Sequence, residues 1–482
     1  MTQPSTEPLS LALPWRIVLA TAAGLLLTGG YALHPLWWAP WLAPIPLIVA
    51  ASSGPRHIWL IGALAGLVAT LSVLGYYLGQ SGAWLGTLLI IALRIMGWGA
   101  TARLAARATW RLPAAWATLV LPVFMAAVEA ATLMVSIHGA AGSLAYSQMD
   151  LPLVTQLASL GGVPLIVFAV LLPGSFFGVW IGRRRQPVDI AWAAGIVGVV
   201  AVAAGLYAND RLAMPQEGPR LHATLIATDR FDYIPKDWSK VWAVYAPQVA
   251  TSARAGGVVV LPEKIALLDP AQTRTAVADV TALARQTRAT IVVGLETHDG
   301  VYRNRSLVAA PDGSVAWYTK QRLVPGFEAR DVPGKTPLMV KVGNAPVGVA
   351  ICKDMHVPSI SREYAGATGI MAVSAWDFGQ DGWMGARMTQ MRGIENGYAV
   401  IRSARNGLLG AYDTTGRIIA EAVSSPGMAV VEADVPVLGH ATLYGRFGNI
   451  FGFLCGLGLI VMLVGIFRKA GGGFPAYPES KR

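Results

Sequence analysis

The sequence is short of charged residues for its length. Only 13% of its 482 residues are charged, whereas 54% are hydrophobic. Charged residues make up about 25% of an average soluble domain, so this composition excludes a protein that is water-soluble throughout. The shortage is uneven, because residues 216–440 have the charge density and the Pro/Gly punctuation of a soluble domain. We therefore expect a membrane protein with one water-soluble domain.

Cysteine is also scarce. The two cysteines, Cys352 and Cys455, do not suggest a disulfide framework, and Cys455 lies inside an apolar run where we expect it to be inert. The seven histidines show no zinc-like spacing. A phosphate-cradling glycine loop is missing, and basic residues are not interleaved with stacking aromatics. We expect no metal, no other cofactor and no nucleic-acid partner.

Eight apolar runs are long enough to cross a bilayer, allowing for short or tilted helices. They lie at 15–33, 37–53, 58–79, 83–102, 114–137, 163–182, 189–208 and 449–467. The run at 37–53 is the weakest, because Pro40, Pro44 and Pro46 disrupt a helix. The first run is predicted to be retained rather than cleaved as a signal peptide, since no basic region precedes it.

Positive charges follow every second run, as expected for cytoplasmic loops. They are Arg56, Arg103, Arg107, Arg111, Arg183, Arg184, Arg185, Arg468 and Lys469. The alternate connections near 34–36, 80–82 and 138–160 contain neither Lys nor Arg. This pattern predicts that both termini are cytoplasmic, that the chain crosses eight times, and that 216–440 lies on the outer face. It also accounts for much of the net charge of +11.

The domain organisation follows from these runs. We predict a seven-helix membrane domain at 1–215, a soluble domain at 216–440, an eighth span within 441–470 and a cytoplasmic tail at 471–482. Inside 216–440, β-rich runs alternate with helical stretches, which favours a layered α/β domain. The predicted strands are 221–228, 257–262, 290–295, 306–310, 315–318, 347–351 and 370–374, and the predicted helices lie near 238–255, 270–287 and 384–398.

Two ionisable residues, Arg94 and Glu129, fall within apolar runs. Such groups are unfavourable in hydrocarbon and usually face protein or water. Each is therefore a candidate for a polar cavity, and snorkelling or helix pairing is the alternative.

Three reactive side chains follow predicted strands. Cys352 comes directly after the apolar run Val347–Ile351, Glu263 follows the run Val258–Leu261, and Lys320 follows a strand. Each is ordinary alone, because a free cysteine is often simply buried and Glu or Lys after a strand is often solvated. Together they suit acyl transfer. Glu263 would take the thiol proton as a general base, and Lys320 would stabilise the thiolate and the oxyanion.

This order of Glu, Lys and Cys resembles the nitrilase superfamily, which implies an αββα sandwich. Such a domain between a seventh and an eighth membrane span is similar to the apolipoprotein N-acyltransferase family. Further segments share that family's pattern: Glu129, Gly142–Gln148 and Gln156–Gly162 in the membrane part, and Leu323–Glu328, Arg387–Gly397 and Arg402–Gly407 in the outer domain.

The resemblance implies a reaction and a location. An acyl chain would pass from a phospholipid to Cys352 as a thioester, and then to the N-terminal amine of a diacylglyceryl-cysteine lipoprotein. The protein would lie in the bacterial cytoplasmic (inner) membrane with its catalytic domain on the periplasmic face. Glu328 would be a second essential carboxylate that positions the triad.

The sequence departs from the family at two places. It has Pro325-Gly-Phe-Glu328 where the family has Pro-Phe-Gly-Glu, and Cys352-Lys353-Asp354 where the family has Cys-Tyr-Glu. Lys353 would either lower the thiol pKa or bind a different head group, and Asp354 would support the site. These departures leave two alternatives: an amidase or N-acyltransferase for a different amine, and a non-catalytic lipid-binding scaffold, against which the intact triad argues.

Overall fold

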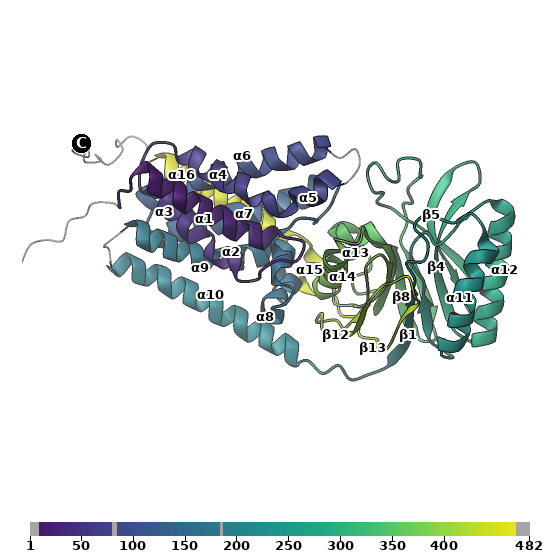
Figure 1. Ribbon diagram of the computed structural model, residues 1–482. Coiled ribbons are helices and arrows are strands. Elements are labelled where there is room, and N and C mark those ends of the chain that lie inside the picture. Colours follow the sequence, from purple (N-terminus) through teal and green to yellow (C-terminus); the bar gives the residue numbers. More distant parts are fainter. Residues whose placement is uncertain (1–8, 80–83, 184–186, 469–482) are drawn as a thin grey trace, which may run out of the picture.

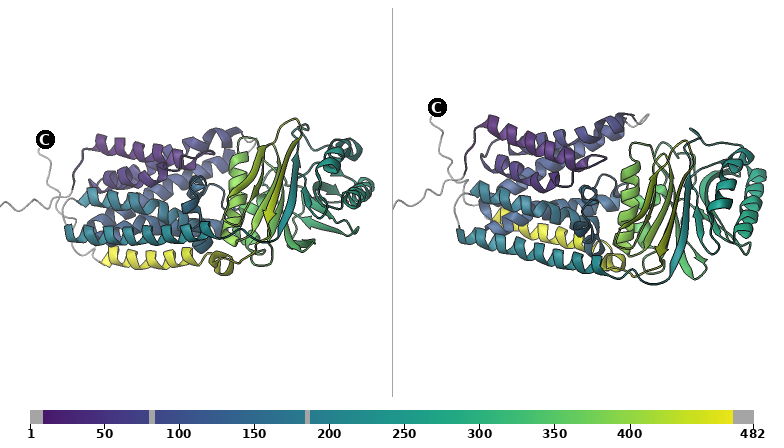
Figure 2. Two further views of the ribbon diagram at one scale, coloured as in Figure 1. Left: turned by 90° about the horizontal axis from the view of Figure 1, so that it is seen from below. Right: turned by 60° about the horizontal axis from the view of Figure 1, so that its bottom comes forward.

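The computed structural model describes residues 9–79, 84–183 and 187–468 (Figure 1). The predicted tail 471–482, the connection at 80–82, and Arg184, Arg185 and Lys469 lie outside the described residues. A bundle of helices forms one end of the molecule, and two β-sheets with their own helices form the other (Figures 1 and 2).

The bundle contains the helices that can cross a membrane. Within the described residues six helices are long and apolar enough: α1 (Leu13–Tyr31), α6 (Trp84–Arg111), α7 (Ala114–Val135), α9 (Ala158–Arg183), α10 (Pro187–Ala213) and α16 (Ile450–Arg468). Helices α4 (Ile58–Ala69) and α5 (Leu71–Gly79) are bent by 51° and count as one further span if taken together. The chain is therefore a multi-pass membrane protein.

The predicted count of eight spans is approximate. The run at 37–53 forms two short helices, α2 (Ala39–Leu42) and α3 (Pro44–Ser52), each with a proline in its first turn. Proline fits the first turn of a helix, so these prolines begin new helices rather than continue one. The connection at 138–160 forms the 3₁₀ helix η1 (Leu144–Gln148) and the short helix α8 (Pro152–Thr155).

Small residues let the membrane helices approach closely. An added Cβ at Gly62 of α4 would lie 2.2 Å from the Trp98 carbonyl oxygen of α6. One at Gly66 would lie 2.5 Å from the Arg94 carbonyl oxygen. Close contact between helix backbones is what small residues provide in a membrane, where no hydrophobic force drives helices together.

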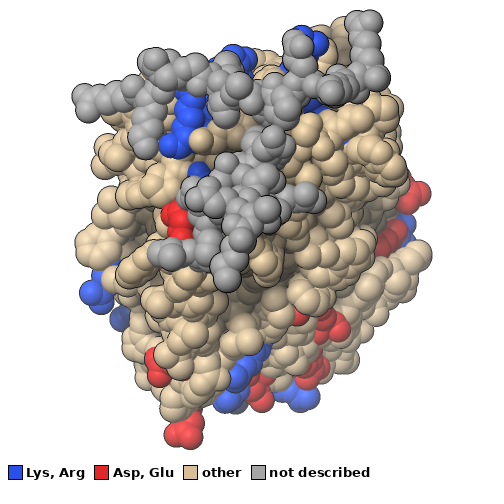
Figure 3. Space-filling view, turned by 90° about the vertical axis from the view of Figure 1, so that its left-hand side faces the viewer, with Lys and Arg blue, Asp and Glu red and all other residues tan. Residues whose placement is uncertain are grey.

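The basic ends of three helices lie together, at the end of the bundle away from the sheets. Arg111 of α6 donates to the Ile466 carbonyl of α16 at 3.0 Å, and Arg183 Nε of α9 donates to the Thr109 carbonyl at 2.8 Å. Seen from that end, most of the visible surface is uncharged (Figure 3).

The soluble part is built on two β-sheets, one of seven strands and one of six. The first sheet has the order β13 (Ala429–Pro436), β1 (Arg220–Ala227), β2 (Val258–Val260), β4 (Thr290–His298), β5 (Tyr302–Ala309), β6 (Val315–Thr319), and the short β3 (Leu267–Leu268) pairs with β4. The second has the order β12 (Ile418–Val423), β11 (Leu408–Tyr412), β10 (Ala399–Arg405), β9 (Ile370–Trp376), β8 (Ala345–Ile351), β7 (Leu338–Val342).

Helices cover the outer face of each sheet. Helices α11 (Trp238–Ser252) and α12 (Pro270–Thr287) pack on the first sheet, and α13 (Pro358–Arg362) and α14 (Gly382–Asn396) lie over the second (Figure 1). One apolar core fills the space between the sheets. The expected αββα sandwich is confirmed, together with the membrane bundle.

Helix α14 also contacts the membrane bundle. Its residues Met388, Met391 and Ile394, spaced three apart on one helix face, belong to the same apolar core as the membrane helices. Figure 2 shows the helical layer of the second sheet between the strands and the bundle. After the last strand, α15 (Leu443–Phe447) leads back to α16.

Both ionisable residues of the apolar runs contact other helices. The Arg94 guanidinium donates to the Ala69 carbonyl at 3.0 Å and lies 4.1 Å from the ring centre of Tyr31. Glu129 interacts with the hydroxyl of Ser143 and with the charge of Arg392. Glu129 therefore faces the junction with the soluble part rather than the lipid.

Candidate functional site

The predicted triad lies where the ends of the two sheets meet. Lys320 follows β6 directly and Glu263 comes shortly after β2, both strands of the first sheet, while Cys352 follows β8 of the second. All three side chains are buried. The structure thus brings together the three residues that the sequence picked out from three separate strand ends.

Cys352 lies at a sharp turn. Its φ of +42° is unusual for a residue other than glycine, and it begins the 3₁₀ helix η2 (Cys352–His356). Such a backbone conformation is held by its surroundings and recurs at functional sites. The Sγ atom donates to the Trp376 carbonyl at 3.6 Å.

Glu263 and Lys320 form a buried ion pair. Their Oε1 and Nζ atoms lie 2.7 Å apart, and Asn304 Nδ2 donates to the same carboxylate oxygen at 2.5 Å. Burial disfavours the charge of Lys320, but Glu263 and Glu328 outweigh it and raise the pKa of the ammonium above its usual range. Lys320 is therefore positively charged beside the thiol.

Glu328 completes this centre from the loop after β6. Its Oε2 lies 2.9 Å from Lys320 Nζ and accepts the Val324 N–H at 2.7 Å, while Asn304 Nδ2 donates to Oε1 at 2.7 Å. Burial works against its charge, but Lys320 and Lys264 lower its pKa. Glu328 is thus an ionised carboxylate that contacts Lys320 beside Glu263, and Asn304 bridges the two carboxylates.

A second lysine, Lys264, lies behind the triad among three carboxylates. Its Nζ is 2.8 Å from Asp331, 3.1 Å from Glu328 and 3.5 Å from Glu296. Burial lowers its pKa, but these charges outweigh burial and raise it. Arg330 adds a further contact to Glu296 at 3.0 Å. Lys320 and Lys264 therefore balance the charges of the buried carboxylates around them, and both contact Glu328.

The residues after Cys352 fasten the loop that follows Lys320. Asp354 accepts the N–H groups of Gln321 and Arg322 at 3.0 and 2.7 Å and the Tyr318 hydroxyl at 2.8 Å. Lys353 Nζ donates to the Leu323 carbonyl at 2.8 Å. The two residues that depart from the family pattern thus hold the 321–323 segment close to Cys352.

These residues carry shifted pKa values. Burial raises the pKa of the Asp354 carboxyl to about 6, against the opposing charge of Lys320. Burial lowers the pKa of the Lys353 ammonium to about 8, and Lys320 acts in the same direction. Lys353 is therefore mainly charged at neutral pH but titrates close to it.

The Cys352 thiol is protonated in this resting arrangement. Burial raises its pKa well above the usual value, the charges of Glu263 and Asp377 raise it further, and those of Lys320 and Arg402 oppose them. A thiolate is the reactive form of cysteine, so any reaction of Cys352 as a nucleophile would have to begin with removal of this proton. Glu263 is a buried carboxylate close enough to act on this thiol electrostatically.

The sequence did not single out several supporting side chains. Asn304 holds both carboxylates, Asp331 holds Lys264, and Asp377 forms a buried pair with Arg402 at 2.5 Å. Asn304 is a buried polar residue in β5, which begins four residues before the predicted start at 306. Asn304 stands between Arg303 and Arg305 in the polar first half of β5, so the sequence offered no apolar pattern that would mark it as buried.

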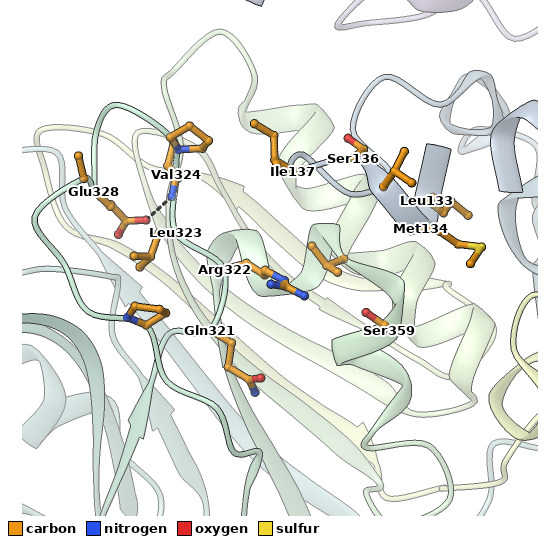
Figure 4. A pocket seen from close by; sticks show the side chains of 15 residues that line it. Leu133, Met134, Ser136, Ile137, Gln321, Arg322, Leu323, Val324, Glu328 and Ser359 are labelled. Atoms are coloured by element: carbon orange, nitrogen blue, oxygen red, sulfur yellow. Dashed lines mark hydrogen bonds between the residues drawn. The ribbon is translucent and has the colours of Figure 1, made fainter. Parts of the chain in front are cut away.

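A pocket of about 530 Å³ opens beside this centre (Figure 4). One wall is the end of α7 and the residues after it, and the other is the loop after β6. The lining residues are Leu133, Met134, Val135, Ser136, Ile137, Gln321, Arg322, Leu323, Val324, Pro325, Glu328, Ala329, Pro333, Val357 and Ser359. Because Glu328 belongs to this wall, the pocket reaches the residues that contact the triad. Within the described ranges, no group of three or more His, Cys, Asp or Glu side chains is placed to hold a metal ion.

Two family models match this chain. The apolipoprotein N-acyltransferase N-terminal domain matches residues 23–176, and carbon-nitrogen hydrolase matches residues 242–452. The apolipoprotein N-acyltransferase of Geobacter metallireducens is 24% identical over 374 residues, which cover 68% of this chain and 70% of that protein. Apolipoprotein N-acyltransferase 1 of Treponema denticola is 29% identical over 142 residues, 27% of this chain and 25% of that protein.

Solved structures resemble the soluble part. An amidase from Nesterenkonia sp. has a TM-score of 0.41 and 19% identity, covering 49% of this chain and 97% of that one. A CN-hydrolase superfamily protein from Xanthomonas campestris has a TM-score of 0.39 and 18% identity, covering 45% of this chain and 91% of that one.

Proposed function

Because the chain belongs to the apolipoprotein N-acyltransferase family, membrane-bound N-acyltransferases of the nitrilase superfamily, we propose that it N-acylates lipoproteins. The acyl donor is a phospholipid, and the acceptor is the N-terminal amine of a diacylglyceryl-cysteine. The observation that carries the proposal is the buried Glu263–Lys320 pair acting on Cys352, in a domain packed against a membrane bundle.

In the first half-reaction Cys352 attacks the donor ester. Glu263 accepts the proton from Sγ, and the thiolate adds to the ester carbonyl carbon. Lys320 stabilises the negative charge on the carbonyl oxygen of the tetrahedral intermediate. The intermediate collapses to a thioester, and Glu263 returns the proton to the alkoxide of the departing lysophospholipid.

In the second half-reaction the neutral acceptor amine attacks the thioester carbonyl carbon. The same Lys320 charge stabilises the second tetrahedral intermediate. The carbon–sulfur bond breaks, Glu263 takes a proton from the nitrogen, and the Cys352 thiolate recovers a proton from Glu263. The products are an amide on the lipoprotein and the free thiol.

The supporting residues hold the side chains of Glu263, Lys320 and Cys352 in position. Glu328 and Asn304 fix Lys320 and Glu263, and Lys264 balances the charge of Glu328. Asp354 and Lys353 hold the loop that carries Glu328 against the cysteine turn. A group held by short, buried contacts needs little reorganisation when charge develops in the reaction.

We propose the orientation from the charge pattern. The basic ends of α6, α9 and α16 would face the cytoplasm of a bacterial inner membrane, with both termini. The catalytic domain, 216–440, would lie on the periplasmic face between the membrane domain 1–215 and the last span within 441–470, with 471–482 in the cytoplasm. The location of the soluble part at the opposite end of the bundle from these arginines supports this assignment.

The test is intact mass spectrometry of purified protein incubated with phospholipid. We expect wild type to gain one acyl chain that hydroxylamine removes, and Cys352→Ala to gain none. The Cys455→Ala variant is the matched control and should acylate like wild type, since Cys455 lies in membrane helix α16. An equal adduct on Cys352→Ala would refute the thioester mechanism.

The acceptor needs its own measurement. A synthetic diacylglyceryl-cysteine peptide should discharge the thioester and gain the acyl chain as a hydroxylamine-stable amide. Transfer to a simple amine but not to this peptide would instead favour an N-acyltransferase for a different amine.

A further inference from the structure

The pocket beside the triad combines an apolar wall with one unbalanced positive charge. Its α7 wall exposes Met134, Val135 and Ile137 by 66%, 81% and 66%. These residues lie at the end of a membrane-spanning helix, where hydrocarbon gives way to the head-group region. An apolar surface at that level suits the upper part of lipid chains.

The opposite wall presents Arg322. Its backbone N–H is held by Asp354, so the start of the side chain is fixed. Figure 4 shows the side chain extending from the loop toward the side of the pocket formed by Ser359 and the α7 residues. No carboxylate among the described residues forms an ion pair with the Arg322 guanidinium, and the residue is exposed.

The other charged lining residue does not cancel Arg322. The carboxylate of Glu328 already contacts Lys320 at 2.9 Å and Lys264 at 3.1 Å. Lys353 lies close enough to Arg322 for the two positive charges to interact. The net field in the pocket is therefore positive, which favours an anion.

We propose that this pocket binds the phosphate group of the phospholipid acyl donor, with Arg322 as its cation, an inference that rests on the proposed function. A guanidinium binds phosphate oxygens through two parallel N–H donors, which a point charge does not match. The exposed Met134, Val135 and Ile137 contact the glycerol end of the acyl chains. The ester lies only a few bonds from the phosphate, so a donor whose phosphate is held by Arg322 would extend its ester along the pocket toward Glu328, which contacts the triad.

This subsite distinguishes the two substrates by chemistry. A phospholipid carries a phosphate, whereas a diacylglyceryl-cysteine has none. The donor is therefore recognised through its charge, and the lysophospholipid that leaves carries that charge away with it. The acceptor has no phosphate for Arg322 to bind, so it does not compete with the donor for this contact. The donor therefore binds first, and the acceptor reacts after the lysophospholipid has left.

The first experiment measures binding without chemistry. Full-length Cys352→Ala protein is titrated with dihexanoylphosphatidylglycerol and, separately, with dihexanoylglycerol, which has the same chains and no phosphate. Adding Arg322→Gln should raise the Kd for the phospholipid about tenfold or more and leave that for the diacylglycerol unchanged. Arg322→Lys should recover only part of the loss, since it restores the charge but not the paired donors.

The matched control is Arg274→Gln, an exposed arginine on α12 at the far side of the sandwich. It should change neither Kd. Equal weakening of both lipids by Arg322→Gln would show that Arg322 only shapes the loop and would overturn the subsite. An unchanged phospholipid Kd would overturn it as well.

A second measurement separates the subsite from the proposed function. If wild type acquires no acyl chain from any phospholipid while Arg322-dependent, phosphate-selective binding persists, the function fails and the subsite stands. If wild type is acylated normally but phosphate selectivity is absent, the function stands and the subsite fails.

Discussion

The core of the membrane bundle and the centre of the candidate site bury different kinds of side chain. The membrane bundle packs around small apolar residues, with alanines such as Ala65, Ala102 and Ala126 fully buried. The site in the soluble part buries ionised groups instead, among them Glu263, Lys320 and Glu328. Helix packing requires close-fitting shapes, whereas each buried charge requires a partner, because an unpaired one is strongly unfavourable. The comparison predicts that single substitutions act very differently in the two regions.

The largest effect is expected at the proposed general base. Glu263→Gln keeps the shape of the side chain but removes the proton acceptor and one balancing charge of Lys320. The rate of acyl-enzyme formation should fall by about 10³-fold, within the usual range for loss of a general base. Mass spectrometry of samples quenched at successive times measures this rate. A rate within about threefold of wild type would exclude Glu263 as the base.

The next effect tests the buried ion network itself. Lys264→Met leaves Asp331, Glu328 and Glu296 without their shared cation. The free energy of unfolding should therefore fall by about 3–5 kcal/mol. The double variant Lys264→Met with Asp331→Leu should recover part of this loss, because it removes an acid as well. Thermal unfolding in detergent measures both. No recovery in the double variant would show that Lys264 acts through packing rather than charge.

A smaller effect is expected from pH at Lys353. Its pKa is about 8 in the fold and about 10.4 when unfolded. Between these values the unfolded chain binds more protons, so this residue makes folding more favourable as pH rises. The Tm of wild type minus that of Lys353→Met should therefore increase from about pH 7.5 to about pH 9.5. A difference that falls over this window would contradict the assignment of the shift to Lys353.

The smallest effect is expected where the membrane bundle and the soluble part meet. The Tyr146 hydroxyl of η1 bonds to Arg392 of α14 at 2.8 Å, and Arg392 keeps a contact with Glu395 at 2.7 Å. Tyr146→Phe should therefore lower the free energy of unfolding by about 1 kcal/mol, the usual value of one hydrogen bond. The acylation rate should stay within about twofold of wild type. A large loss of activity without loss of stability would give this contact a catalytic role.

The local parts of the fold were predictable. Apolar runs predicted the membrane helices, because a helix in lipid must be apolar along its length. Abrupt ends of apolar runs placed Glu263, Lys320 and Cys352 at strand ends. Strand β13 was not predicted. It pairs with β1 from Arg220↔Pro436 to Ala227↔Ala429, and these partners lie at opposite ends of the soluble part in the sequence. A local pattern identifies a strand more readily than its distant partner.

The network of ion pairs around the triad was harder to predict from the sequence. Lys264 follows Glu263 directly in the sequence, yet its shortest contact is to Asp331, 67 residues later. Lys353 and Asp354 stood out only as departures from a family pattern, and their contacts to the 321–323 segment give them a physical role. Side-chain partners across loops depend on how the sheets stack, which residue spacing does not encode.

Hydrophobic runs and their interruptions are local properties of a chain. They were therefore enough to predict a membrane protein with a layered α/β domain and three reactive residues at strand ends. Three features depend on the folded arrangement instead: how the charges of that site are balanced, how α14 packs on both sandwich and bundle, and where Arg322 meets the pocket at the end of α7. Burial makes each of these charges depend on partners far away in the chain, and folding alone brings those partners together.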